Sequence, residues 1–293
     1  MLIELSYILD EMMPKWPTNP SEKYTFELST RRGDPNNASS VFHHIHNGTH
    51  VDAPSHFDPK GRTIDQLPIE DFYFIRPLVL ELPKRRGENV TLTDIEAHRA
   101  EIMACDILLI YTGYSSLRET SPEAFVNGFP SVSPAAARCL RVDFPGLKAV
   151  ALDSISFDDA ATAVEEGFPS HHSLLDTSEA LPGRTLLLFE DVNIGRLLGV
   201  KDIKAICAFP VRWKGLEGAP VSMVANGVSA LIRKRGQALV RAEFLCVQKV
   251  DLSGLQRLPD KIRVDGHEIA HAQAIICPIR QAGCASAITR EDC

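Results

Sequence analysis

The sequence lacks the patterns that mark several large classes of protein. Its seven cysteines are odd in number and contain no Cys-x-x-Cys pair. This argues against a disulfide framework or a cysteine-ligated zinc site, and it favours free thiols in a reducing compartment. No apolar run approaches the roughly 18 residues that a membrane helix needs. We therefore expect a cytoplasmic protein with no membrane partner.

The chain also has no excess of positive charge. The chain has 31 lysines and arginines against 38 aspartates and glutamates, which gives a net charge of -7. A domain that binds nucleic acid normally carries a basic patch, so we expect no nucleic-acid partner. The first residues lack a basic stretch followed by an apolar one, so we expect no signal peptide.

The remaining composition is that of a globular protein. The 293 residues, of which 44% are hydrophobic and 24% charged, are enough for one large domain with an appendage. The residue pattern changes after about Asn226, beyond which the runs typical of strands are less regular. We predict one domain over residues 1–227 and a C-terminal extension of unknown role over residues 228–293.

Short apolar runs between turn residues predict strands, and two helix starts are recognisable. Ser133 and Pro134 are typical of an N-cap followed by proline at the first helical position. The run from Thr93 to Glu96 has the pattern of a capping box. This mixture predicts an α/β fold. The strands are predicted at residues 2–9, 41–45, 78–82, 107–112, 149–153, 185–190, 205–209 and 221–225.

Histidine is concentrated in one segment, which also contains an aspartate, Asp52. Imidazole and carboxylate are the ligands that zinc, manganese and iron prefer, so this segment predicts a metal site. Five of the ten histidines lie within fourteen residues: His43, His44, His46, His50 and His56.

Distances between the ligands require this segment to bend. On a helix His46 and His50 would share a face, but a glycine and a proline in the segment oppose a helix. In a straight strand the two residues would lie roughly 13 Å apart, whereas the ligands of one metal each lie about 2.0–2.2 Å from it. Gly48 can supply the backbone angles of a bend. We predict a tight loop that wraps His46, His50 and Asp52 around a metal, with His56 lining the site.

Further ligands must come from distant parts of the chain. Three protein ligands leave a metal position open to water, as in catalytic zinc sites. The candidates are the adjacent pair His171 and His172, of which either could be the ligand, and Glu190, which ends an apolar run. Asp153 also ends an apolar run and is a weaker candidate.

Aromatic residues near the histidine segment are candidates for substrate binding. Trp16 and Phe42, together with Phe57 and Tyr73, could hold a flat substrate. Packing in the core would explain these side chains equally well. We select Trp16 and Phe42 as the substrate-binding candidates.

The histidine segment resembles the signature of a known family. Residues 46–56 follow the pattern His-x-Gly-Thr-His-x-Asp-x-Pro-x-His, which is similar to that of the metal-dependent cyclase family. This family includes bacterial kynurenine formamidase, isatin hydrolase and trans-dienelactone hydrolase. Asp153-Ser154, His172-x-Leu174-Leu175, Glu190 and the stretch from Pro210 to Pro220 add to the resemblance, which covers roughly residues 1–227.

The resemblance implies a swivelling β/β/α fold and a homo-oligomer, either a dimer or a tetramer. It implies that His56 is a metal ligand or the proton shuttle beside the metal. It also implies one or two Zn²⁺ or Mn²⁺ ions per subunit, held by His46, His50, Asp52, His172 and Glu190.

We predict a hydrolase that cleaves the C–N bond of an amide, formamide or cyclic amide in a small-molecule substrate. Metal-bound hydroxide would attack the carbonyl, and His56 would pass a proton to the leaving nitrogen. Lactone hydrolysis uses the same chemistry and is an open alternative. A non-enzymatic metal-binding module is less favoured, because structural zinc sites are usually closed and rich in sulfur.

Overall fold

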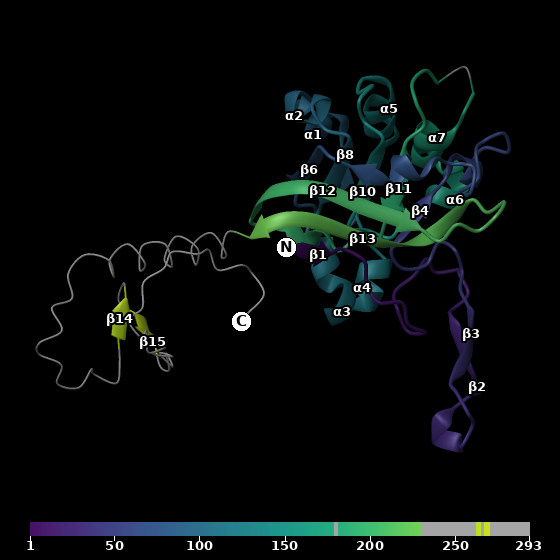
Figure 1. The fold of residues 1–293 in the computed structure, drawn as a ribbon. Coiled ribbons are helices and arrows are strands. Elements are labelled where there is room, and N and C mark those ends of the chain that lie inside the picture. Colours follow the sequence, from purple (N-terminus) through teal and green to yellow (C-terminus); the bar gives the residue numbers. More distant parts are fainter. Residues whose placement is uncertain (179–180, 230–261, 265–266, 270–293) are drawn as a thin grey trace, which may run out of the picture. The chain divides into compact units, whose positions relative to one another are not determined.

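The computed structural model describes residues 1–178 and 181–229, together with the backbone of residues 262–264 and 267–269 (Figure 1). Contacts divide the chain into two units, residues 1–237 and 238–293. In the second unit, β14 (Ile262–Val264) pairs with β15 (His267–Ile269) in antiparallel fashion. The boundary that we predict after residue 227 falls inside β13 (Gly218–Ser229).

A mixed sheet of nine strands organises the first unit. Four strands in one half run parallel to one another, and the strand β4 joins this half to the antiparallel half. β1 (Leu2–Glu4) pairs with β13 beside the main path. Along that path the order is β5 (Tyr73–Phe74), β12 (Val200–Pro210), β13, β4 (His50–Asp52), β11 (Leu187–Glu190), β10 (Ala149–Leu152), β8 (Ile107–Tyr111) and β6 (Pro77–Glu81).

Each face of the sheet carries its own hydrophobic core. In β8, Ile107 and Leu109 belong to one core, while Leu108 and Ile110 belong to the other. This follows from the alternation of side chains along a strand. Both faces are covered, so the parallel strands are continuous apolar runs, which is why their positions can be predicted from the sequence.

Short helices cover the sheet. Figure 1 shows α1, α2, α5 and α7 on one side of the sheet and α3 and α4 on the other. Within the described ranges, none of these helices has the length and apolar character that a membrane crossing requires. Their bounds are α1 (Leu92–Ala97), α2 (Arg99–Met103), α3 (Leu117–Thr120), α4 (Pro122–Val126), α5 (Pro134–Val142), α6 (Ala163–Glu166) and α7 (Pro169–Leu175).

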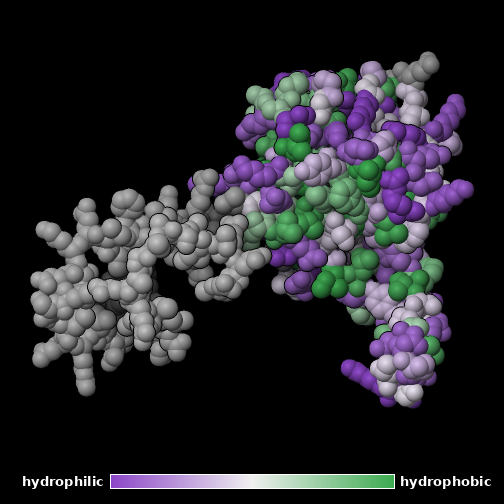
Figure 2. All heavy atoms as spheres, in the orientation of Figure 1, coloured by the Kyte–Doolittle hydropathy of each residue, from purple (hydrophilic) through white to green (hydrophobic). Residues whose placement is uncertain are grey.

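Two short strand pairs lie outside the main sheet. β7 (Asn89–Val90) runs parallel to β9 (Ser131–Val132). β2 (Lys23–Leu28) and β3 (Ala38–Phe42) form an antiparallel hairpin that projects from the body of the first unit (Figure 1). Most residues of this hairpin are exposed, and polar and apolar residues both cover its surface (Figure 2).

The predicted fold class is confirmed, and most of the predicted strands are found. The runs at 78–82, 107–112, 149–153 and 185–190 correspond to β6, β8, β10 and β11, and those at 205–209 and 221–225 fall inside β12 and β13. The prediction at 2–9 is wrong beyond Glu4, and the one at 41–45 is displaced to Ala38–Phe42. Beyond Glu4 some backbone hydrogen bonds go to side chains and not to a neighbouring strand. The Tyr7 amide, for example, donates to the Thr49 hydroxyl.

One helix start is confirmed and one is corrected. Ser133 caps α5 by accepting a hydrogen bond from the Ala136 amide. In contrast, α1 is capped by Thr91, because the Thr91 hydroxyl and the Asp94 carboxylate bond reciprocally to each other's backbone amides. The predicted cap at Thr93 is therefore wrong by half a turn. Of the cysteines, Cys105, Cys139 and Cys207 are free thiols, as expected.

Candidate metal centre

The histidine segment bends at Gly48, as predicted. Gly48 has a φ of +65°, and a Cβ at this position would lie 2.4 Å from Cδ2 of Leu9. The positive φ therefore favours glycine, and a side chain here would also have to displace Leu9. The bend is also held by Thr49, whose hydroxyl donates to the backbone oxygen of Asp191 at 2.6 Å.

After the bend, β4 enters the sheet between β11 and β13. Its register places His50 opposite Glu190 of β11, a residue far away in the sequence. Pro54 then begins a short 3-10 turn that ends at His56. This turn directs His56 toward His46. The two imidazole rings stack with their centres 3.9 Å apart.

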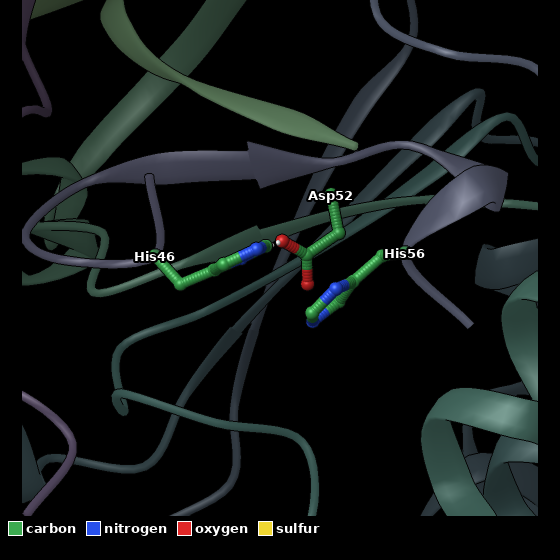
Figure 3. Close-up of side chains that lie close together, drawn as sticks. All are labelled: His46, Asp52 and His56. Atoms are coloured by element: carbon green, nitrogen blue, oxygen red, sulfur yellow. Dashed lines mark hydrogen bonds and ion pairs between the residues drawn. The ribbon is translucent and has the colours of Figure 1, made fainter. Parts of the chain in front are cut away.

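Asp52 is the centre of the resulting cluster. Its side chain is fully buried, and Oδ1 lies 2.9 Å from Nδ1 of His46 and 3.4 Å from Nε2 of His50. Nε2 of His50 also lies 3.3 Å from Oε2 of Glu190. Figure 3 shows the Asp52 carboxylate facing the imidazoles of both His46 and His56. The structure thus brings together five of the residues that the sequence predicted.

The sixth member of the cluster is His171 and not His172. Nε2 of His171 lies 3.2 Å from Oε1 of Glu190 and 3.6 Å from Oδ2 of Asp52. His172 is exposed, and its ring contacts the edge of Phe57. Neighbouring helical residues point in different directions, so only one of the two can face the site. His171, Leu174 and Leu175 share a buried face at i, i+3 and i+4 spacing, and this signal could have identified it.

Burial and charge act in opposite directions on the ionisable groups. Burial disfavours charged histidines, but the Asp52 carboxylate raises the pKa of both His46 and His50. Burial also disfavours the charged form of Asp52, yet the surrounding histidines hold its pKa well below the usual range. For His56, burial outweighs the attraction of Asp52 and lowers the pKa to about 4. His56 is therefore a neutral imidazole at pH 7.

The donor atoms of the cluster fit a divalent metal ion. Nε2 of His50 and Oδ2 of Asp52 are buried but make no hydrogen bond within the described part of the chain. Buried polar atoms are normally bonded, so such orphans in a cluster of imidazoles and carboxylates point to a cation. Donor atoms in each of two sets, His46–Asp52–His56 and His50–Asp52–Glu190, lie within 4.8 Å of one another. The nitrogen and oxygen donors suit zinc or manganese.

The aromatic candidates lie at different distances from the cluster. Phe57 contacts it directly, because its ring stacks on His171 with the ring centres 4.7 Å apart. Trp16 packs on Phe168, and the ring centres of Phe168 and His171 are 6.1 Å apart. Trp16 is therefore separated from the cluster by the Phe168 ring. Phe42 lies on the projecting hairpin with half of its surface exposed, and the structure does not bring it to the cluster.

Sequence reasoning missed several polar residues around the cluster. Asp158 and Glu217 bond to the outward-facing nitrogens of His171 and His46. Nothing in the linear pattern relates these residues, since Glu217 lies 171 positions after His46. Asp153, the weaker candidate, is not part of the cluster around Asp52. Its carboxylate oxygens accept hydrogen bonds from Thr112, Gly113 and Ser115.

A buried ion pair supports the segment that follows Glu190. Asp191 adopts a φ of +50°, which is unfavourable for a residue with a side chain. Its carboxylate receives bonds from Nε and Nη2 of Arg118, the shorter two being 2.8 and 2.7 Å. The Arg118 guanidinium also lies 3.8 Å from the ring centre of Tyr7. The ion pair therefore supports the unfavourable backbone angle of Asp191, the residue that follows Glu190.

The described residues contain one other group of possible metal ligands, and it is already neutralised. Glu96, Cys139 and Asp143 lie close together near the surface. Arg99 forms ion pairs with both carboxylates of this group. A guanidinium in this position replaces the cation that the carboxylates would otherwise attract.

The sequence matches the Cyclase family over residues 3–159, which is more than half of the chain. The chain belongs to this family. The matched region includes the bent segment with His46, His50, Asp52 and His56, whereas His171 and Glu190 lie beyond it.

Named relatives and solved structures agree with this assignment. The kynurenine formamidase of Geobacillus thermodenitrificans is 29% identical over 173 residues, covering 59% of this chain and 76% of the relative. The kynurenine formamidase of Salinibacter ruber is 27% identical, covering 76% of this chain and 96% of the relative. Isatin hydrolase A from Labrenzia aggregata, bound to benzyl benzoate, has a TM-score of 0.64 at 20% identity, covering 77% of this chain and 93% of that chain.

A further solved structure, described as a potential metal-dependent hydrolase with cyclase activity, has a TM-score of 0.57 at 22% identity. It covers 77% of this chain and 96% of that chain. At such identities the structures establish the cyclase-type fold. Together with the kynurenine formamidase relatives and the cluster, the comparisons support a metal-dependent hydrolase of the cyclase family.

Proposed function

We propose that this protein hydrolyses the C–N bond of an amide, formamide or cyclic amide in a small-molecule substrate. The observation that carries this proposal is the convergence of imidazoles and carboxylates around Asp52, with two buried donor atoms left without hydrogen bonds. The similarity to kynurenine formamidases, which covers 96% of the Salinibacter ruber relative, favours amide-type bonds.

The residues that would hold one or two Zn²⁺ or Mn²⁺ ions form two overlapping groups around Asp52. His46 and His50 lie near Oδ1 of Asp52 and His171 lies near its Oδ2. Glu190 contacts both His50 and His171. When bound, a divalent metal supplies Lewis-acid chemistry that lowers the pKa of water and polarises a carbonyl.

His56 is suited to move the proton. Its pKa of about 4 leaves the imidazole neutral at pH 7, so an unprotonated ring nitrogen is available to accept a proton from water. The ring stacks on His46, lies beside Phe57 and is half-buried. Its low pKa means that a protonated His56 readily gives up the proton, and the leaving nitrogen is the natural acceptor.

Aromatic side chains give one wall of the site an apolar character. The Phe57 ring lies against both His56 and His171, and Phe168 packs on Phe57 with the ring centres 5.4 Å apart. Such a wall suits a flat, aromatic substrate. We therefore include aryl formamides and fused cyclic amides among the first substrates to test.

The test is hydrolysis by the full-length protein before and after metal removal. We expect that a chelator abolishes hydrolysis of N-formylkynurenine or isatin and that added Zn²⁺ or Mn²⁺ restores it. Undiminished hydrolysis in metal-stripped protein would contradict the proposal. Turnover of a dienelactone without turnover of either amide would show that the bond cleaved is an ester.

A further inference from the structure

A histidine can bind a metal only through a ring nitrogen that carries no proton, so the proton must be held on the other nitrogen. In the cluster, the rings of His46, His50 and His171 each direct one nitrogen toward Asp52. The second nitrogen of each ring meets an acceptor. For His50 this acceptor is the backbone oxygen of Gly48, 2.9 Å from Nδ1. For the other two rings it is a carboxylate from another part of the chain.

Asp158 holds His171. Its Oδ2 atom lies 2.6 Å from Nδ1 of His171 and 3.0 Å from the backbone nitrogen of the same residue. Oδ1 accepts a hydrogen bond from the Ser170 amide at 2.9 Å. A carboxylate bonded to amides on both oxygens can only accept, so the proton of the imidazole is placed on Nδ1. Nε2 is thereby left to face Glu190 and Asp52.

Glu217 holds His46. Its Oε1 atom lies 3.3 Å from Nε2 of His46, and its backbone oxygen accepts a hydrogen bond from the Ala53 amide at 2.8 Å. The next residue, Gly218, pairs with Asp52, and a Cβ there would lie 3.4 Å from Cε1 of His46. The turn before β13 therefore packs directly against the His46 ring. Nδ1 of His46 is the nitrogen that faces Asp52.

The turn that carries Glu217 is itself fixed. The Gly215 amide donates to Oδ1 of Asp65 at 2.8 Å, and the Arg212 guanidinium donates to the backbone oxygen of Leu67 at 2.8 Å. These bonds tie the turn to the loop after the histidine segment. The Glu217 carboxylate is consequently presented at a defined position, although part of it is exposed to solvent.

We propose that Asp158 and Glu217 are positioning residues of the metal centre, which determine the nitrogen that His171 and His46 present to the metal. This inference rests on the proposed function, because it assumes that both histidines bind the metal. Neither carboxylate needs to touch the substrate. Asp158 has the larger effect, since its bond to histidine is shorter and the residue is buried.

The first experiment replaces Asp158 with asparagine and uses the adjacent Asp159→Asn as its matched control. Asparagine must place its NH₂ group against a backbone N–H or against the imidazole, so it cannot satisfy all three donors. The Kd for Zn²⁺, measured by competition with a coloured chelator, is expected to rise about 10–100-fold in Asp158→Asn. Asp159→Asn is expected to keep the wild-type Kd. Equal Kd values for all three proteins would overturn the role of Asp158.

The second experiment uses Glu217 and does not depend on whether Asp158→Asn folds. Glu217→Gln keeps an oxygen that accepts from Nε2–H, whereas Glu217→Ala removes the acceptor. We expect the Kd for Zn²⁺ to increase from wild type to Gln to Ala, with the number of bound ions unchanged. Lys214→Ala, an exposed residue of the same turn, should match wild type. A variant that loses one whole equivalent of zinc would show instead that Glu217 is itself a ligand.

A spectroscopic measurement separates positioning from general stability. In zinc-loaded protein labelled with ¹⁵N-histidine, the Nδ1–H signal of His171 should be protected from exchange with water. We expect this protection to be lost in Asp158→Asn and kept in Asp159→Asn. If wild type binds neither Zn²⁺ nor Mn²⁺, the proposed function fails. If wild type binds metal and the variants behave identically to it, only the positioning role fails.

Discussion

At the residue scale, adjacent side chains have opposite roles in this protein. His171 is buried against two carboxylates of the cluster, whereas His172 is exposed beside Phe57. We predict that His171→Ala lowers zinc binding strongly, because it removes a ligand, and that His172→Ala leaves it unchanged. Metal content after dialysis, measured by elemental analysis, checks both variants. Equal losses in the two variants would place the second half of the site elsewhere.

His50 and His56 differ in a comparable way. Nε2 of His50 is aligned with carboxylates from two strands, while His56 stacks on His46 as a neutral ring. We predict that His50→Ala loses most of the bound metal and that His56→Ala keeps metal but loses about 10²–10⁴-fold in rate, the usual contribution of a positioned acid or base. Metal content and kcat are measured on the same samples. Metal loss in His56→Ala to the level of His50→Ala would make His56 a primary ligand.

At the scale of secondary-structure elements, local side-chain chemistry decides where α1 begins. Thr91 and Asp94 form the capping box, and Lys84 donates a further hydrogen bond to the Asp94 carboxylate. We predict that Thr91→Ala lowers the free energy of unfolding by about 1 kcal/mol, because an amide at the helix start loses its acceptor. Thr93→Ala is the matched control, with a change within about 0.5 kcal/mol. Urea denaturation of both variants tests this, and a larger effect at Thr93 would contradict it.

At the scale of the whole molecule, metal binding should stabilise the folded chain. The candidate ligands His50, Asp52, Glu190 and His171 come from β4, β11 and α7, which meet only in the folded state. At a free Zn²⁺ concentration of about 100 times Kd, we expect a gain of about 2.7 kcal/mol in the free energy of unfolding. Thermal unfolding with and without zinc measures this, and His50→Ala should show a much smaller gain. An unchanged transition in wild type would mean that zinc does not bind the folded state.

The hairpin β2–β3 leads to a prediction about assembly. Phe26 and Val41, which the register places on one face of this ribbon, are 67 and 63% exposed, and Phe42 on the other face is 51% exposed. An isolated two-stranded hairpin is marginally stable in water, and apolar patches of this kind often mark interfaces. We predict that the hairpin is buried in a homo-oligomer and that Phe26→Ser with Val41→Ser shifts the mass measured by light scattering toward the monomer. A monomeric wild-type protein would contradict the predicted oligomer.

Elements whose signals are local can be predicted from the sequence. Continuous apolar runs identify the buried parallel strands, because strands covered on both faces have no polar side. The spacing of His46, His50 and Asp52, with the distances a metal demands, required a bend at Gly48, and the φ of +65° agrees. The i, i+3 and i+4 spacing of His171 with Leu174 and Leu175 favours His171 over His172, and the tertiary structure turned His171 toward the cluster. It also brought Asp158 and Glu217 to the imidazoles, because contacts between distant segments depend on strand register and helix rotation, which local patterns do not encode.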